Sequence, residues 1–489
     1  MATGPATLSP AYWPPARSPG GVASPQATPF PWATGIAVIP LLATFMRIAS
    51  PPTATLSYLL IAAYAFMGRR QAVLALYLCC LFNLMNHGFP GRVPSGAALL
   101  RYIVFFSAAL SVLFHGRSRQ APRQGFLLLA FTFLLCMLIT VHCLAVSPIM
   151  DVSLLKSLSF TIVAMTLFAG WSWMDPTERR LTEQMIVGGL MIAAVASIPL
   201  IRMSIGYMKN PGLFQGVTVH PNNFGPIMAI LAIVMATQCL TLRPLRPWRV
   251  GMLGVALLMV ILSKSRMSLV AFVGGIAIGF LAEMFRGVLA HYKKSPRMVA
   301  GRLAAGCLLL LVLVVFRINS LAAFYDDFIR KGQKDVENIG EAFQKSRGFL
   351  IEKLQRNIAE NPLTGIGFGI ASDSSMWVGI DRDPIFGLPL MYTIEKGVMP
   401  LAVLEELGIP LGMLVFLWIA MISIRATRGG IVPLTAYSVA ILTNLAESTL
   451  FSPGGMGMMI LLMAGWAATA PPGGAWVRPL PKPRPVPVT

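Results

Sequence analysis

Charged residues are scarce in this chain: they make up 12% of its 489 residues, whereas soluble domains are about one quarter charged. Hydrophobic residues account for 56%, and the mean hydropathy is +0.70. A soluble globule of this size would lack the polar residues to cover its surface. All six cysteines fall within apolar runs, which excludes a disulfide-stapled domain and a zinc site. The N-terminal residues show no cleavage pattern of a signal peptide. What remains is a polytopic membrane protein.

Long apolar runs recur along the chain and are too continuous for the strands of a membrane barrel. They lie at 30–46, 54–67, 71–86, 97–115, 125–147, 153–174, 185–205, 223–241, 248–263, 267–284, 303–318, 398–423, 431–450 and 455–470. Some are short for a span of about 20 residues, so we expect about 12 to 14 transmembrane helices. The predicted fold class is an all-α polytopic membrane protein. Pro-rich stretches at 1–29 and 471–489 indicate disordered cytoplasmic tails.

The distribution of basic residues predicts the orientation of the spans. The formal net charge of +20 comes from lysines and arginines clustered between apolar runs, which is typical of membrane topology rather than of nucleic-acid binding. Every second loop is rich in them, which places both termini in the cytoplasm. Transmembrane helices then occupy 30–318 and 397–470, and 319–396 forms one large extracytoplasmic helical loop. This loop holds 11 of the 19 acidic residues, and we expect it to be catalytic because long loops usually carry function.

Inside the loop, residues 337–360 are predicted to form an amphipathic helix with Arg347 in the middle of its apolar face. A guanidinium in that place needs an anionic partner. It forms a structural ion pair, snorkels to the membrane surface, or holds a phosphate or carboxylate. After the helix, Gly365, Gly367 and Gly369 allow a tight turn whose N–H groups are available to an anion.

Two segments on the predicted outer side supply further polar groups before a span. Lys264 and Arg266 oppose the inside bias of basic residues, so they either contact lipid head groups or bind a lipid-linked pyrophosphate. His220, Asn222 and Asn223 either cap the following helix or bind a hydroxyl-rich ligand.

Acidic side chains support rival interpretations. Glu405, Glu406 and Glu447 are ionisable groups at membrane depth, which favours a proton relay in a transporter. Asp381 and Asp383 form an Asp-x-Asp pair that suits a metal ion, but the proline that follows favours a turn. We therefore expect no metal site.

Four stretches, in this order, resemble the O-antigen ligase and polysaccharide polymerase superfamily of bacterial membrane proteins. They are GVTVHPNNFG, SKSRMSLVAFVGG, SRGFLIEKLQRNIAENPLTGIGFG and PLAVLEELGIPLG, within residues 210–415. The resemblance implies a GT-C glycosyltransferase that needs no metal or other cofactor. It would move glycan from undecaprenyl pyrophosphate at the periplasmic face of the inner membrane. The resemblance assigns Arg347, Lys264 and Arg266 to the pyrophosphate, where fixed positive charge stabilises the leaving group.

The family often has a histidine that activates the acceptor, and this chain has Gly397 and Val398 in its place. This departure favours a polymerase of lipid-linked repeat units, with Glu395 as the acceptor base near the membrane. Alternatively, Glu395 and Lys396 form a surface pair that only anchors the span. The other candidates for the base are His220, Asp373, Asp381 and Asp383.

Alternative functions remain open at this point. A ligase would transfer glycan to a lipid or protein acceptor, and a flippase or proton-coupled exporter would also have many spans and buried acids. A transporter usually places its essential groups at the membrane midplane between inverted repeats, whereas the ionisable groups here crowd into one loop. A cell-wall glycan polymerase of the shape and division family is a third alternative. The expected partners are lipid-linked oligosaccharide, membrane lipids, a flippase and a chain-length regulator, and no nucleic acid.

Overall fold

The structure is a computed structural model that describes residues 31–91, 99–121, 125–210, 212–242, 245–286, 348–377, 381–382, 389–391 and 396–470. The helices of this part are α1 (Pro31–Ala49), α2 (Pro51–Ala65), α3 (Arg69–Asn83), α4 (Leu100–His115), α5 (Phe126–Val146), α6 (Met150–Trp173), α7 (Pro176–Ser197), α8 (Pro221–Thr241), α9 (Pro247–Leu262), α10 (Arg266–Arg286), α15 (Phe349–Glu360), α16 (Met399–Ala426), α17 (Ile431–Thr443) and α18 (Met456–Thr469). Short 3-10 helices lie at Pro199–Arg202, Ser204–Tyr207 and Ser374–Trp377, and the strands are β1 (Asp381–Arg382) and β2 (Pro389–Met391).

Each predicted apolar run among the described residues coincides with a helix, so the helical fold class is confirmed for this part of the chain. The exception is the short antiparallel pair of β1 and β2, in which backbone pairing of a few residues leaves no hydrophobic pattern to read. The run at 303–318 lies outside the described residues. So do both predicted tails (1–29 and 471–489) and most of the predicted loop at 319–396.

In the part of the chain that the structure describes, six helices are long and apolar enough to cross a membrane: α5, α6, α7 with the 3-10 turn after it, α8, α10 and α16. This finding supports a polytopic membrane protein. Several other apolar helices are shorter; α17, for example, has 13 residues. At 1.5 Å per residue it rises about 20 Å, less than the roughly 30 Å of a hydrocarbon core.

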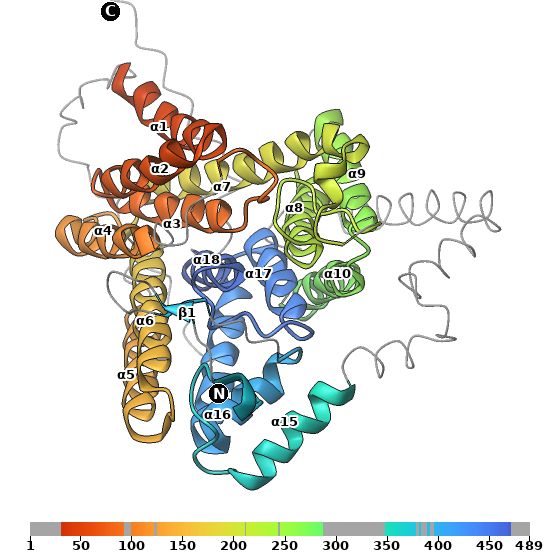
Figure 1. Ribbon diagram of the computed structural model, residues 1–489. Coiled ribbons are helices and arrows are strands. Elements are labelled where there is room, and N and C mark those ends of the chain that lie inside the picture. The colour runs from red at the N-terminus through yellow and green to blue at the C-terminus, as the bar shows by residue number, and fades with distance from the viewer. Residues whose placement is uncertain are drawn as a thin grey trace, which may run out of the picture.

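The buried centre of the bundle contains α8, α17 and α18 (Figure 1). Nearly every residue of α18 is buried, including Trp466. On the outer helices, large apolar side chains are exposed, such as Phe45 of α1, Phe126 of α5 and Val270 of α10. A surface of this kind is stable against lipid rather than water, which fits the composition of the chain.

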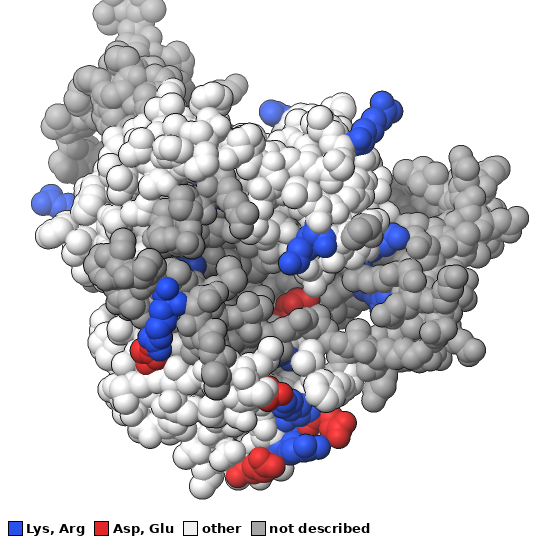
Figure 2. Space-filling view, viewed as in Figure 1, with Lys and Arg blue, Asp and Glu red and all other residues white. Residues whose placement is uncertain are grey.

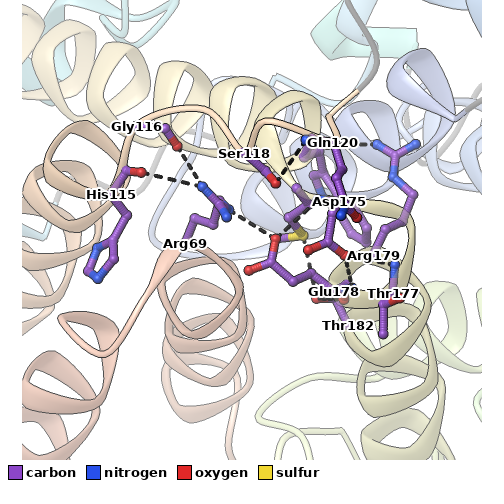
Figure 3. Close-up of polar contacts among 12 residues, drawn as sticks. Arg69, His115, Gly116, Ser118, Gln120, Asp175, Thr177, Glu178, Arg179 and Thr182 are labelled. Carbon is purple, nitrogen blue, oxygen red and sulfur yellow. Dashed lines mark hydrogen bonds and ion pairs between the residues drawn. The ribbon is translucent and has the colours of Figure 1, made fainter. Parts of the chain in front are cut away.

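One end of the bundle, which we call the Arg179 end, joins the starts of α3 and α7 to the ends of α4, α6 and α18. Figure 3 shows Arg69, Glu178 and Arg179 at this end. Arg69 pairs with Glu178 at 2.9 Å and donates to the Gly116 carbonyl at 2.9 Å. Glu178 also completes a capping box with Asp175, which fixes the start of α7. Arg179 donates to the carbonyls of α6 and α18 and is almost fully buried. These contacts tie helix ends together.

The opposite end, which we call the Glu406 end, joins the ends of α3, α5, α9 and α17 to the starts of α6, α8, α10 and α16. For example, Asn86 after α3 donates its backbone N–H to the Val217 carbonyl before α8, at 2.8 Å. The loops that gather at each end are those that the basic-residue pattern assigns to one side of the membrane. Which compartment each end faces stays a prediction.

Candidate functional site

The site is built around a break in α16. Gly408 interrupts this helix with a φ of 71°, in the left-handed region that favours glycine. The segment 361–369 packs against the break, where the Ile409 N–H donates to the Pro362 carbonyl at 2.8 Å. A β-carbon on Gly408 would overlap the Leu363 carbonyl. The close approach of two backbones therefore requires glycine at this position.

The glycine-rich turn after α15 has the tight geometry that its sequence predicts. Gly365, Gly367 and Gly369 have φ values of 68°, 114° and 72°. The Gly367 N–H donates to the Glu406 carbonyl at 3.2 Å, and the Gly369 N–H donates to the Glu406 carboxylate at 2.7 Å. A β-carbon on Gly365 would lie 2.6 Å from the Glu405 carbonyl oxygen. The anion that this turn holds is thus a side chain of the same chain, and substrate contact by Gly365 and Gly367 stays a prediction.

Two lysines and two glutamates form what we call the buried ion cluster: Lys156 of α6, Lys396, and Glu405 and Glu406 of α16. The Lys396 ammonium donates to Glu405 at 2.6 Å and lies 3.2 Å from Glu406. Lys156 lies 3.8 Å from the other oxygen of Glu406. Lys396 is 1% exposed and Glu405 is fully buried. Charges buried this deeply must be paired, and here two positive charges balance two negative ones.

The loop helix α15 is positioned by this cluster. Asn357 donates to Glu405 at 2.6 Å, and the Ser372 hydroxyl donates to the other oxygen of Glu405 at 3.0 Å. Farther out, Lys353 forms an ion pair with Asp373. The hydrogen bond from Lys353, with further ones from Ser375, holds the pKa of Asp373 well below its ordinary value. Charged side chains gather over α15 on a surface that is otherwise mostly uncharged (Figure 2).

A cavity of about 350 Å³ lies beside the buried ion cluster. Glu406 and Lys156 form part of its wall, and Arg101 of α4 supplies a second cation. The hydroxyls of Ser448 and Ser452, in the loop before α18, also line it. The cavity therefore combines two cations, one carboxylate and several hydroxyls. This set suits a ligand with both an anionic group and hydroxyl groups.

The predicted polar group before α8 lies at the same end of the bundle. The ring of His220 caps α8 by accepting from the Asn222 N–H at 3.0 Å, so the cap is the histidine rather than an asparagine. The Asn222 side chain donates to Glu447 at 2.9 Å. Glu447 precedes the serines of the cavity wall in sequence. Its pairing with an amide gives a structural role to one of the acids that suggested a proton relay.

The segment with the predicted basic pair adjoins the start of α8, because a β-carbon on Gly225 would overlap the Ser265 side chain. Ser265 lies between Lys264 and Arg266, and Lys264 has a positive φ of 49°. The structure thus brings Lys264 and Arg266 to the same end as His220. Asn223 donates its backbone N–H to the His220 carbonyl at 3.0 Å.

The predicted catalytic residues Arg347 and Glu395 lie outside the described residues, as does Asp383. α15 ends at Glu360, before the Asn-Pro pair, as its sequence predicts. Asp381 belongs to β1, where the adjacent Arg382 forms an ion pair with Asp151 at 2.5 Å. The structure therefore leaves the roles of Arg347 and Glu395 as predictions.

Sequence reasoning missed three cations of the site: Lys396 and Lys156 beside Glu406, and Arg101 in the cavity wall. One of the two alternatives places Lys396 in a surface pair with Glu395, whereas in the structure it is buried and pairs with Glu405. Lys156 and Arg101 lie on the predicted outer side, and no sequence motif singles them out. A usable signal was their position within the first turns of apolar helices, since a cation placed there needs a partner.

Among the described residues, no three or more histidine, cysteine, aspartate and glutamate side chains come together as a metal site. Independence of metals stays a prediction. A comparison of the chain with known protein families and with curated proteins finds no match. The residues of the site can bind an anion through Arg101 and Lys156 and can hydrogen-bond to a hydroxyl group.

Proposed function

We propose that the protein is a metal-independent glycosyltransferase that polymerises lipid-linked oligosaccharides. It would join repeat units carried on undecaprenyl pyrophosphate into a surface polysaccharide at the outer face of the bacterial inner membrane. The proposal includes about 12 to 14 spans, cytoplasmic termini, and a Glu406 end that faces the periplasm. Its partners are then membrane lipids, a flippase and a chain-length regulator.

The observation that carries this proposal is the cavity at the Glu406 end. It sets Arg101 and Lys156 around a space of about 350 Å³ whose remaining wall is rich in hydroxyl groups and glycine. A departing pyrophosphate needs fixed positive charge in a site that excludes water, and sugar hydroxyls need acceptors such as Glu406. The superfamily resemblance agrees, because two of its stretches, the Gly365–Gly369 turn and the Glu406–Gly408 segment, contact each other.

The residues have distinct tasks in this proposal. Arg101 and Lys156 bind the pyrophosphate in the cavity, and the superfamily resemblance assigns Arg347, Lys264 and Arg266 to the same group. Glu406 accepts a hydrogen bond from a sugar hydroxyl and orients it. Two lysines and a backbone N–H already occupy the carboxylate oxygens of Glu406. Proton removal from the acceptor is therefore left to another group, for which Glu395 is the proposed residue.

A proton-coupled exporter of lipid-linked glycan is the second candidate, favoured by one observation. Transporters often contain a broken helix with ionisable groups beside the break, and α16 has Glu405 and Glu406 directly before Gly408. In that case Lys396 would exchange its partner during transport. Backbone hydrogen bonds join the 361–369 segment to α16, from the Ile366 and Gly367 N–H groups and to the Pro362 carbonyl, and they favour a fixed site over a moving one.

Deleting the gene and sizing the glycans tests the proposal. A polymerase leaves single repeat units on lipid at the outer face, a ligase leaves long lipid-linked chains, and an exporter leaves units that face inward. A cell-wall polymerase leaves this glycan unchanged. The Arg101→Gln variant should reproduce the polymerase defect, and the exposed Arg119→Gln at the other end is the matched control. Purified protein should also elongate lipid-linked units in excess EDTA.

A further inference from the structure

A second cavity, which we call the apolar cavity, lies between α1, α3, α7 and α8 and has a volume of about 460 Å³. Its wall is almost entirely apolar and includes Leu41 of α1, Leu81 of α3, Ile192 of α7 and Met228 of α8. Water gains few hydrogen bonds in such a space, so an apolar ligand is favoured there.

The apolar cavity opens towards the lipid-facing surface. Leu41 and Ile192, on either side of it, are 60% and 56% exposed. On α7 the wall contains Gly188 and Gly189, which differ in their surroundings. A β-carbon on Gly189 would overlap the Tyr77 hydroxyl, whereas a β-carbon on Gly188 would have no atom within 4 Å. Helix packing therefore does not require a glycine at position 188, and the space beside it is open to the cavity.

The end of α3 lies between the apolar cavity and the charged cavity, because Leu84 packs against Gly455, where a β-carbon would lie 3.8 Å from Leu84 Cδ2. Leu84, at the end of α3, lines the apolar cavity. One turn earlier, the Cys80 thiol donates to the Gly455 carbonyl at 3.5 Å, and Gly455 lines the charged cavity. A Thr218 to Met85 bridge closes the apolar cavity at the same end of the bundle. One site for an apolar chain thus adjoins one site for an anionic group.

We propose that the apolar cavity binds the polyprenyl chain of the lipid-linked donor while the charged cavity binds its pyrophosphate. This inference rests on the proposed function, since it needs a substrate with both parts. A lipid-linked pyrophosphate carries one long apolar chain directly beside its charged group, and α3 separates one apolar space from one charged space. Burial of the chain would supply affinity, and the charged group would set its position.

The test uses the full-length protein in nanodiscs of phosphatidylethanolamine and phosphatidylglycerol. The probe is a polyprenyl pyrophosphate with a photoreactive diazirine near the far end of its chain. We expect cross-links to peptides of α1 and α7. Gly188→Leu fills the open space and should lower this labelling at least about tenfold, because it excludes several methylene groups from a buried site. Gly251→Leu in α9 is the matched control, since Gly251 also has open space around it.

Several outcomes would overturn the inference. A diacyl phospholipid probe that labels the same peptides and resists competition by polyprenyl pyrophosphate would make the cavity a general lipid site. The apolar cavity would be excluded as the binding site if Gly188→Leu were labelled as strongly as the wild type. It would also be excluded if the wild-type cross-links were confined to helices other than α1 and α7. Labelling needs no glycan transfer, so the two proposals separate. If the protein binds the probe in the apolar cavity but transfers no glycan, only the proposed function is contradicted. If it transfers glycan but is labelled elsewhere, only the proposed role of the apolar cavity is contradicted.

Discussion

The two ends of the helix bundle both contain buried charges but use them differently. At the Arg179 end, the guanidinium groups of Arg69 and Arg179 donate to backbone carbonyls, and Glu178 caps a helix (Figure 3). At the Glu406 end, Lys156 and Glu406 pair with each other and also line a cavity. Charge that binds carbonyls is satisfied within the fold, whereas charge beside a cavity is available to a ligand. The difference locates the proposed chemistry at the Glu406 end.

The largest effect is expected for the arginine that precedes α15. Arg347→Ala should abolish glycan transfer while the amount of protein in the membrane stays near normal, because the proposal assigns the positive charge of this arginine to the pyrophosphate. Arg347→Lys should also fail if the planar guanidinium binds two oxygens at once. Transfer by purified protein measures both. Full activity of Arg347→Ala would exclude this arginine from the site and weaken the contrast between the two ends.

A change within the buried ion cluster should reduce both stability and transfer. Lys396→Met leaves Glu405 without its ammonium partner, and such a loss costs about 3–5 kcal/mol. The double variant Lys396→Met with Glu405→Gln removes the unpaired charge and should recover most of the stability. The measurement is the thermal unfolding midpoint in detergent. Equal midpoints for the single and double variants would contradict the assignment of Lys396 as the partner of Glu405.

A change at the Arg179 end should affect stability alone. Arg179→Gln loses hydrogen bonds to the carbonyls of Trp171 and Thr469, and leaving such groups unpaired costs about 1–3 kcal/mol. The transfer rate per folded molecule should equal that of the wild type. A loss of rate at equal protein level would show that the two ends do not divide their roles in this way.

How far the sequence predicted this structure depends on the range of the interactions. The apolar runs predicted the described helices because burial along a helix is a local pattern, and the glycine turn was predicted because positive φ favours glycine. The pairing of Lys396 with Glu405 was not predicted. The neighbouring Glu395 is a local candidate partner, whereas the contact with Glu405 forms only in the folded protein. The break at Gly408 was also missed. Gly408 and Pro410 are a local signal for a break, because a proline within a helix removes a hydrogen bond, but the geometry of the break depends on the approach of the Leu363 backbone.

The smallest effect concerns the pH dependence of the α15 region. Because Lys353 lowers the pKa of Asp373 in the folded protein, the ionised carboxylate stabilises the fold above the unfolded pKa of about 3.9. This contribution is lost as the pH falls towards the lower pKa of the folded state. Asp373→Asn should therefore lower the unfolding midpoint by a constant amount at neutral pH, and the difference should shrink below about pH 4. If the difference in midpoint between the wild type and Asp373→Asn grows in acid, the pKa of Asp373 is not lowered by folding.

The most direct test of the account compares one cation from each end by the transfer rate per folded molecule. Purified Lys156→Gln and Arg69→Gln are supplied with lipid-linked repeat units, and the length of the glycan is followed with time. Lys156→Gln should lose about a hundredfold or more in rate, the scale of losing one stabilising group in a preorganised site. Arg69→Gln should elongate glycan at the wild-type rate, since Arg69 contacts only helix ends. Equal rates for the two variants would contradict the account.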